Sequence, residues 1–293
     1  MSGLSRPASV EEMVARQAKL FTEEEVNEGL SLKLRRTDVV ITPFAKCGTT
    51  WLQQIVHTLR TRGDMDFDDI SRVVPWIEAS PALGIDLNGP QKAEPRAFKS
   101  HLDADAVPRG GKYINAIRSP GDALFSMHKF MEGWFLEPGA VSVDEFARQQ
   151  FITTGAYWEH LLSWWHRRKD ADVLYLVYEH MREDLPGTIR QVAEFIDIPL
   201  DDELMVITEE HASLDFMLKH KNRFDDCLLR TFSEEKSGLP KGSDSSKVRV
   251  GQVGSGKKGI SQAVQDELDE VWRREVTESI AYESYDDLIG SLV

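Results

Sequence analysis

A short segment around Lys46 combines the residue types that bind a tetrahedral anion. The apolar run Val39–Thr42 leads into Lys46-Cys47-Gly48-Thr49-Thr50, and a helical pattern of apolar residues begins at Trp51. The N–H groups at such a helix start point outward with the positive end of the helix dipole, and a glycine lets the backbone approach a ligand. We therefore expect a phosphate or sulfate ester here. An ordinary turn with a solvated lysine is the alternative interpretation.

Two more cationic segments could bind a second anionic group. Arg118 ends an apolar run and Ser126 follows eight residues later, so both could bind phosphate oxygens at the carboxyl edge of a sheet. Residues 249–259 hold three cations and four glycines in 11 residues, which suits a loop around an anion. The alternatives are a structural ion pair for Arg118 and a solvated basic turn for 249–259.

A candidate general base lies in the segment Lys99-Ser100-His101. A histidine can accept a proton near neutral pH, and a neighbouring lysine can stabilise negative charge during the same reaction. A lone histidine at the end of a strand is more often structural. Its chemical interpretation therefore depends on the anion site lying close by.

Strands and helices must alternate along the chain to position these residues. We expect strands at 39–42, 113–118 and 173–177, and helices at 10–20, 49–59, 143–168, 187–196 and 261–280, with a further helix starting after Ser119. Apolar strands between helices predict an α/β domain with a parallel sheet covered by helices. We expect a single domain over 37–293, a helical or loop extension over 1–36 packed on it, and a mobile loop over 232–248.

Composition narrows the possible functions. The chain has 293 residues and a net charge of -14, which argues against general nucleic-acid binding. Its two cysteines, Cys47 and Cys227, are too few for a disulfide scaffold and have no metal-ligand spacing with the eight histidines, so we expect no metal. No apolar run could span a bilayer and no signal-peptide core is evident, so a cytoplasmic location is expected.

Taken together, the motifs resemble those of the cytosolic sulfotransferase family. The family's first loop, close to YPKSGTTW, is matched by residues 44–51, FAKCGTTW. Its KTHLP segment is matched by 99–102, KSHL, and its RNPKDVAVSYYHF segment by 118–130, RSPGDALFSMHKF, with the same spacing from arginine to serine. The family's YED resembles Tyr178-Glu179, and its RKGxxGDWK resembles 249–257, RVGQVGSGK.

This resemblance implies a P-loop-NTPase-like sulfotransferase fold and the co-substrate 3'-phosphoadenosine 5'-phosphosulfate (PAPS). It implies that His101 is the base, that Lys46 neutralises the leaving phosphate oxygen, and that Lys99 stabilises the transferring sulfuryl group. The residues that it implies for binding PAPS are Lys46, Cys47, Gly48, Thr49, Thr50, Trp51, Arg118, Ser126, Tyr178, Ser213, Leu214, Arg249, Val250 and Gly251. No metal is implied.

The sequence departs from the family at several positions. Cys47 replaces a serine, Ala212-Ser213-Leu214 replaces the T-S-F segment beside adenine, and the dimer motif KxxxTVxxxE is degraded, so a monomer and a homodimer both stay open.

The acceptor is weakly encoded in the sequence. A hydroxyl or amine of a small molecule or lipid is expected, in an apolar pocket formed by Phe44, Trp76, Met127, Phe130 and Trp134. These five residues could equally belong to the core. Two other functions stay open: a catalytically silent nucleotide-binding module, and a phosphometabolite kinase, which would need a magnesium-binding acid beside the loop.

Overall fold

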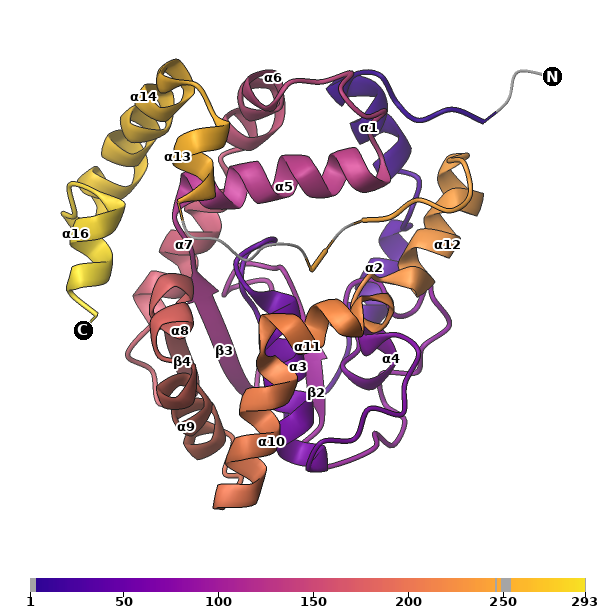
Figure 1. Ribbon diagram of the computed structural model, residues 1–293, viewed down its shortest axis with the longest axis vertical. Coiled ribbons are helices and arrows are strands. Elements are labelled where there is room, and N and C mark those ends of the chain that lie inside the picture. Colours follow the sequence, from indigo (N-terminus) through magenta and orange to yellow (C-terminus); the bar gives the residue numbers. More distant parts are fainter. Residues whose placement is uncertain (1–3, 246, 249–253, 293) are drawn as a thin grey trace.

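A parallel four-stranded sheet forms the centre of the computed structural model, which describes residues 4–245, 247–248 and 254–292 (Figure 1). The strand order is β2-β1-β3-β4, with β1 at Val39–Ile41, β2 at Ala97–Lys99, β3 at Lys112–Ile117 and β4 at Val173–Val177. In the register, Val40 lies opposite both Phe98 and Tyr113, and Ile117 lies opposite Val177. The predicted α/β fold with a parallel sheet is confirmed.

Alternate residues of β1 are buried on opposite faces of the sheet. Val39 and Ile41 join an apolar cluster with Leu52 and Ile55 of a helix that begins at Thr49, whereas Val40 packs in a second cluster with Phe98 and Trp164. Successive side chains of a strand point to opposite faces. A strand covered by helices on both faces therefore has the continuous apolar sequence seen here.

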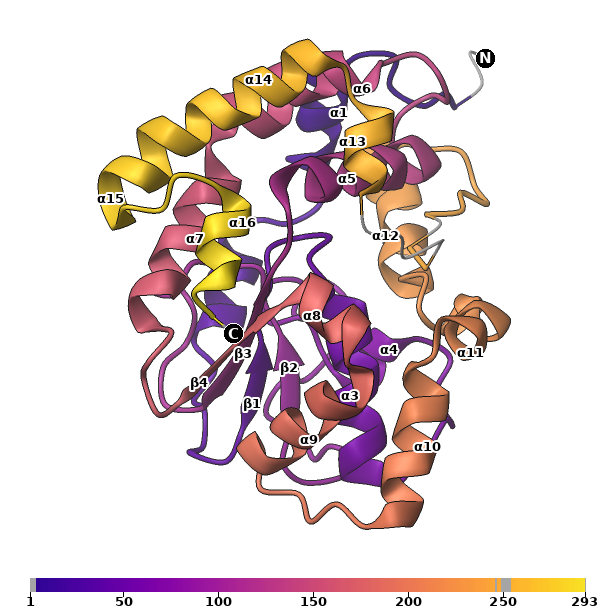
Figure 2. The ribbon, with the colours of Figure 1, turned by 60° about the vertical axis from the view of Figure 1, so that its left-hand side comes forward.

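Helices cover both faces of the sheet and extend beyond the carboxyl ends of its strands. The α-helices are α1 Val10–Gln17, α2 Glu23–Leu30, α3 Thr49–Thr61, α4 Ile70–Val73, α5 Pro120–Trp134, α6 Val143–Phe146, α7 Ala156–Arg167, α8 Tyr178–Glu183, α9 Leu185–Phe195, α10 Asp202–Ala212, α11 Leu214–Lys219, α12 Cys227–Ser237, α13 Ser255–Gly259, α14 Gln262–Val271, α15 Glu278–Ile280 and α16 Tyr285–Gly290. Figure 2 shows α3, α9 and α10 on one side of the sheet and α7 on the other. Among the helices of the described ranges, none has the length and apolar character needed to cross a bilayer.

A separate apolar cluster lies beyond the carboxyl ends of the strands. It joins Val10 and Met13 of α1 to Leu124 of α5, Phe146 of α6 and Val264 of α14. The chain N-terminal to the first strand therefore contributes buried side chains to the same body as the sheet. The division of the chain at residue 36 stays a prediction.

The helix α5 begins as its sequence predicts. Ser119 is the N-cap and its hydroxyl accepts a hydrogen bond from the Asp122 N–H, while Pro120 occupies the first turn. By contrast, the N-cap of α3 is Gly48, which has no side chain, so no capping side chain covers the first N–H groups of this helix.

Three expectations for secondary structure are wrong in part. The predicted helix at 261–280 is interrupted by a π-helical stretch at Trp272–Thr277. The first third of the predicted loop at 232–248 is helical, because α12 continues to Ser237, and Ser233 and Ser237 are buried. The predicted helix at 143–168 is interrupted by a π-helical stretch at Ala147–Ile152 and by Gly155, which has a positive φ of 66°.

Candidate active site

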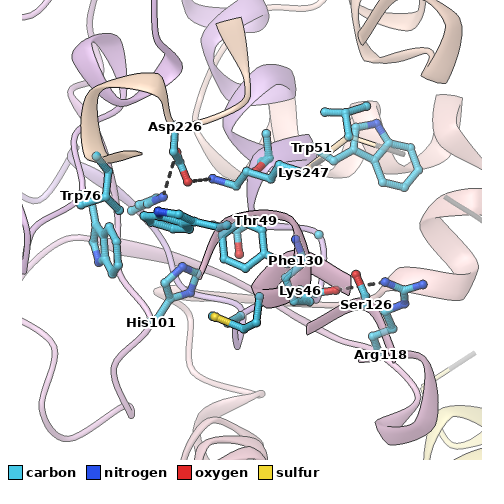
Figure 3. Close-up of a pocket in the computed structure, with 18 of the residues that line it drawn as sticks. Lys46, Thr49, Trp51, Trp76, His101, Arg118, Ser126, Phe130, Asp226 and Lys247 are labelled. Carbon is cyan, nitrogen blue, oxygen red and sulfur yellow. Dashed lines mark hydrogen bonds and ion pairs between the residues drawn. The ribbon is translucent and has the colours of Figure 1, made fainter. Parts of the chain in front are cut away.

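A cavity of about 500 Å³ opens at the carboxyl ends of β1, β2 and β3, where the predicted anion-binding and base residues meet. Its wall comes from segments far apart in the sequence, and Figure 3 shows Lys46, His101, Arg118 and Ser126 around it. The sequence-predicted residues that line it are Lys46, Gly48, Thr49, Thr50, Trp51, Trp76, Lys99, His101, Arg118, Ser126, Phe130, Trp134, Tyr178 and Leu214. The position agrees with the general rule that open α/β sheets bind ligands at this edge.

The loop between β1 and α3 has the backbone of an anion cradle. Lys46 and Gly48 have positive φ values of 73° and 99°, which turn the chain tightly into the helix. A Cβ atom on residue 48 would lie 3.1 Å from Cδ2 of Tyr178. The hydroxyl oxygen of Thr49 is buried and has no hydrogen-bond partner in the described part of the chain. A buried hydroxyl without a partner is costly, so a ligand oxygen would relieve it.

Cys47 lies beneath this loop and does not line the cavity. Its side chain is fully buried, and burial raises the pKa of its thiol to about 12. The thiol is therefore neutral at physiological pH. The Cys47 N–H donates to the carbonyl oxygen of Phe44 at 3.0 Å, so this residue contributes to the shape of the loop.

Arg118 connects the end of β3 to the anion loop. Its Nη1 donates to the carbonyl oxygen of Lys46 at 3.1 Å, and its guanidinium lies 4.3 Å from the centre of the Tyr178 ring. An ion pair to Asp122 at 3.8 Å joins it to α5, which also carries Ser126. Arginine, serine and lysine from three elements thus line one cavity, as the sequence predicts.

His101 has the tautomer that a general base needs. Its Nδ1 lies 2.8 Å from the carbonyl oxygen of Pro43, and because a carbonyl can only accept, Nδ1 carries the hydrogen. The unprotonated nitrogen is therefore Nε2. Burial, together with the charge of Lys99, lowers the pKa of His101 to about 3, so that the ring is neutral at pH 7. Glu78 fixes the backbone by accepting the His101 N–H at 2.9 Å.

Lys99 is buried beside this histidine and is held by two partners. Its Nζ lies 3.8 Å from Oδ1 of Asp226 and 4.6 Å from the centre of the Trp76 ring. Burial lowers the pKa of Lys99 to about 8, although Asp226 opposes this effect. Asp226 also pairs with Lys247, and both residues line the cavity.

Asp226 and Lys247 were not anticipated from the sequence. Lys247 lies only two residues before the basic stretch that begins at Arg249, which is a usable signal. Asp226 has no sequence signal of a role in the site, because an aspartate just before a helix usually caps that helix.

Two aromatic rings line the cavity beside the start of α3. Trp51 and Tyr178 lie 5.8 Å apart at an interplanar angle of 68°, and the Trp51 indole Nε1 donates to the Ala212 carbonyl oxygen at 2.8 Å. Leu214 lines the cavity next to them. Ser213 does not, because its hydroxyl caps α11 by accepting the Phe216 N–H.

The apolar end differs from the expectation at two positions. Trp76, Phe130 and Trp134 line the cavity, whereas Phe44 and Met127 are not part of its wall. Phe44 instead packs edge-on against Phe151, Tyr157 and His160. The structure adds apolar wall residues that the sequence did not indicate, namely Leu20, Phe21, Phe125, Met131 and Phe135.

The predicted binding residues Arg249, Val250 and Gly251 lie outside the described residues. Within the described ranges, no group of three or more His, Cys, Asp or Glu side chains is placed to hold a metal ion. The described part of the site therefore combines an anion cradle, a neutral histidine, a buried lysine and an apolar chamber. This arrangement can transfer an anionic group to an acceptor whose proton the histidine removes.

Known proteins share both the sequence pattern and the fold. A profile described as Sulfotransferase domain matches residues 36–280. Sulfotransferase 1B1 of Mus musculus is 27% identical over 255 residues, which cover 82% of this chain and 83% of that protein. Sulfotransferase 1C2 of Homo sapiens is 24% identical over 291 residues, which cover 94% and 95%.

Two solved structures have a similar fold. Retinol dehydratase in a complex with retinol and PAP superposes with a TM-score of 0.69 at 18% identity, covering 88% of this chain and 87% of that one. Mouse sulfotransferase SULT7A1 complexed with PAP superposes with a TM-score of 0.67 at 20% identity, covering 88% and 91%.

Proposed function

The chain belongs to the sulfotransferase family, and we propose that it moves a sulfuryl group from PAPS to a hydroxyl or amine of a small apolar molecule or lipid. The observation that supports this most strongly is the meeting of the anion loop, His101 and Lys99 at one cavity that also has an apolar end. One cavity can then hold donor and acceptor with their reacting atoms adjacent.

The loop residues suit the phosphosulfate end of PAPS. The buried hydroxyl of Thr49 lacks a protein partner among the described residues, and the positive φ of Gly48 turns the backbone around the site. Lys46 would bind the bridging and terminal phosphate oxygens. PAPS supplies an activated sulfuryl group whose transfer leaves the bisphosphate nucleotide PAP.

The rest of the nucleotide would follow the residues at the carboxyl edge. Arg118 and Ser126 would bind the 3'-phosphate, and Trp51 with Tyr178 would hold the adenine. The family resemblance adds further residues that would bind PAPS, namely Arg249, Val250, Gly251, Cys47, Ser213 and Leu214. For Cys47 a backbone contact is the proposed form, since its side chain is buried below the loop.

The chemical step that we propose uses three side chains. Nε2 of His101 accepts the proton of the acceptor hydroxyl as the oxygen attacks sulfur. Lys46 neutralises the charge that develops on the leaving phosphate oxygen, and Lys99 stabilises the sulfuryl oxygens in the transition state. Fixed cations in a site with little water stabilise such charge better than water does, because they need no reorganisation.

The acceptor end favours an apolar molecule. Phe21, Trp76, Phe130 and Trp134 line this end of the cavity, and about 500 Å³ must hold both substrates. Ring faces of this kind bury flat or extended apolar groups. We therefore propose a phenol, sterol, retinoid or lipid alcohol rather than a sugar or a peptide.

We also propose that the reaction takes place in the cytoplasm. Cys47 and Cys227 are both free thiols, which is consistent with a reducing compartment. A fluorescent fusion at either terminus would test this location.

Transfer of labelled sulfate tests the proposed function. The purified chain is incubated with 35S-labelled PAPS and a panel of phenols, sterols, retinol, androsterone and alkyl amines, with and without a chelator. We expect a labelled organic product that is insensitive to the chelator and is lost in Lys46→Met. The matched control is Lys129→Met on α5, because Lys129 pairs with Glu132 at 2.6 Å away from the loop and is expected to retain activity.

The outcomes separate the alternatives. Binding of PAP without any labelled product would indicate a silent nucleotide-binding module. Chelator-sensitive transfer of a phosphate from ATP would indicate a kinase.

A further inference from the structure

A buried carboxylate joins two lysines at the wall of the cavity. Asp226 is 3% exposed and lies at the start of α12 with a positive φ of 47°. Its Oδ1 faces Nζ of Lys99 at 3.8 Å, and its Oδ2 accepts a hydrogen bond from Nζ of Lys247. Figure 3 shows Asp226 with interactions to both sides, one of them to Lys247. We refer to Lys99, Asp226 and Lys247 as the Asp226 clamp.

The carboxylate has few other partners in the described residues. Ser71 donates to Oδ1 at 3.4 Å, at the limit of a hydrogen bond. Burial alone would raise the pKa of Asp226, but Lys247 and Lys99 together hold it well below its usual value. The carboxylate is therefore charged at any pH at which the protein works, and the clamp carries a net charge of one positive unit when both lysines are protonated.

Lys99 needs such a partner because it is buried among groups of mixed charge. The charged and titratable groups that act on Lys99 come from several elements. Asp226 precedes α12, Lys247 follows it, and Asp69 precedes α4. Glu78 lies two residues after Trp76, and His101 lies two residues after Lys99. Burial favours the neutral amine, Lys247 repels the ammonium, and Asp226 is the largest favourable charge. A neutral Lys99 could not stabilise the sulfuryl oxygens.

We propose that Asp226 is a positioning residue of sulfuryl transfer, whose carboxylate holds Lys99 as an ammonium at the cavity wall with one oxygen while binding Lys247 with the other. This inference rests on the proposed function for its catalytic consequence. Its geometric content is independent, because the clamp sets where Lys99 lies and whether it is protonated. Lys247 competes for the same carboxylate and repels the Lys99 ammonium, so Asp226 and Lys247 act on the charge of Lys99 in opposite directions.

Opposite shifts in the titration of Lys99 test the clamp directly. Protein with 13C- and 15N-labelled lysine is titrated by NMR, and the Lys99 signal is assigned by its loss in Lys99→Met. We expect Asp226→Asn to lower the pKa of Lys99 from about 8 by about one pH unit or more. Lys247→Met should raise it, because a repelling charge is removed. Shifts in the same direction, or none in Asp226→Asn, would overturn the proposal.

The pH dependence of turnover gives the catalytic readout. The profile of kcat/KM for the nucleotide reports groups of the free protein. With the pKa of Lys99 lowered from about 8 to about 7, the ratio of the rate at pH 6 to the rate at pH 8 rises about fivefold in Asp226→Asn. An equal loss at both pH values would mean that Asp226 acts only on the fold.

The neighbouring aspartate provides a matched control. Asp225 pairs with Arg230 at 2.9 Å and accepts hydrogen bonds from the Ser245 hydroxyl and the Lys247 backbone. Asp225→Asn therefore loosens the same segment but leaves the Asp226 carboxylate and the side chains of both lysines unchanged. We expect a loss that is independent of pH and no shift for Lys99. A wild-type protein that transfers no sulfuryl group to any acceptor would refute the proposed function, while the NMR titration would still decide whether the clamp exists.

Discussion

Replacing His101 by alanine should separate chemistry from binding. The ring nitrogen Nε2 is the proposed base, and general base catalysis contributes about 10² to 10⁴-fold. We expect His101→Ala to slow single-turnover sulfuryl transfer by that factor, which corresponds to about 3 to 5 kcal/mol of transition-state stabilisation. The affinity for PAP should stay within about twofold to threefold, because His101 is a base rather than a phosphate ligand in this assignment.

The titration of His101 gives a second, independent number. With a pKa of about 3, about one ring in 300 is protonated at pH 5.5, whereas a histidine with the ordinary value of 6.5 would be about nine-tenths protonated there. In the free protein, the NMR signal of His101 Cε1 should therefore be constant from pH 5.5 to 8. Its folded pKa is depressed, so the neutral form is present over this whole window and base function is not lost until much lower pH.

The assay combines rapid-quench sulfuryl transfer at saturating PAPS with calorimetric titration of PAP. His166→Ala is the matched control, because His166 lies in the last turn of α7 and is not part of the cavity wall. A His101→Ala rate within threefold of wild type would refute the base assignment. A signal that titrates near pH 6.5 would refute the buried, neutral ring.

Three further predictions concern the cradle and the buried charges. In Gly48→Ala, the positive φ of 99° and the 3.1 Å approach to Tyr178 should distort the loop at a cost of about 1 to 2 kcal/mol. Calorimetry should then show about fivefold to thirtyfold weaker binding of PAP. Asp38→Asn should lower the free energy of unfolding by about 3 to 5 kcal/mol in urea titrations, because it removes the only carboxylate that pairs with the buried Arg96 guanidinium among the described residues, at 2.5 Å. Burial lowers the pKa of His160 to about 4, so its neutral ring contributes stability above pH 6.5 that is lost as the pH drops toward 4. The free energy of unfolding of the wild type should therefore fall between pH 7.5 and 5.5, and in His160→Gln this fall should be smaller by about 1.4 kcal/mol.

The anion loop could be predicted because its signal is local. Lysine, glycine and two threonines between a strand and a helix specify a cradle within about ten residues, and the structure brings Lys46, Gly48, Thr49 and Thr50 to the cavity. Arg118 and Ser126 were equally accessible, because the strand, the N-cap and the helix between them each have a clear sequence pattern.

The sequence predictions failed where the outcome depends on the direction of a side chain or on a partner that is distant in the chain. Phe44 follows Pro43 in a loop whose backbone soon adopts a positive φ, so no helical or strand period specifies where its ring points. The helix α12 was missed because two of its buried positions are serines. Ser233 accepts the Trp134 indole N–H at 2.8 Å and Ser237 donates to the Arg16 carbonyl oxygen at 2.9 Å, which an apolar pattern does not register.

The clamp was beyond sequence reasoning for a related cause. Asp226 and Lys99 are more than a hundred residues apart, and a single acidic residue carries no periodic signal. The tautomer of His101 likewise depends on a carbonyl 58 positions away in the chain.

Three of the cations that line the cavity each lie over an aromatic ring, which suits an anionic ligand. Lys46 lies 4.1 Å from the Phe130 ring centre, Lys99 lies 4.6 Å from that of Trp76, and Arg118 lies 4.3 Å from that of Tyr178. A ring attracts a cation by about 0.5 to 2 kcal/mol, and it does not match the charge-assisted hydrogen bonds of a phosphate.

An arriving phosphate can therefore outcompete a ring, although at Arg118 and Lys99 it also contends with the carboxylates of Asp122 and Asp226. Lys99 is the most deeply buried of the three, at 1% exposure, and a ring alone does not offset the loss of hydration of its ammonium. A carboxylate, that of Asp226, therefore accompanies the ring at Lys99, and it binds a second lysine as well. The second lysine binds the other oxygen of Asp226 and leaves the clamp with a net positive charge, which in the proposed reaction would face the sulfuryl group.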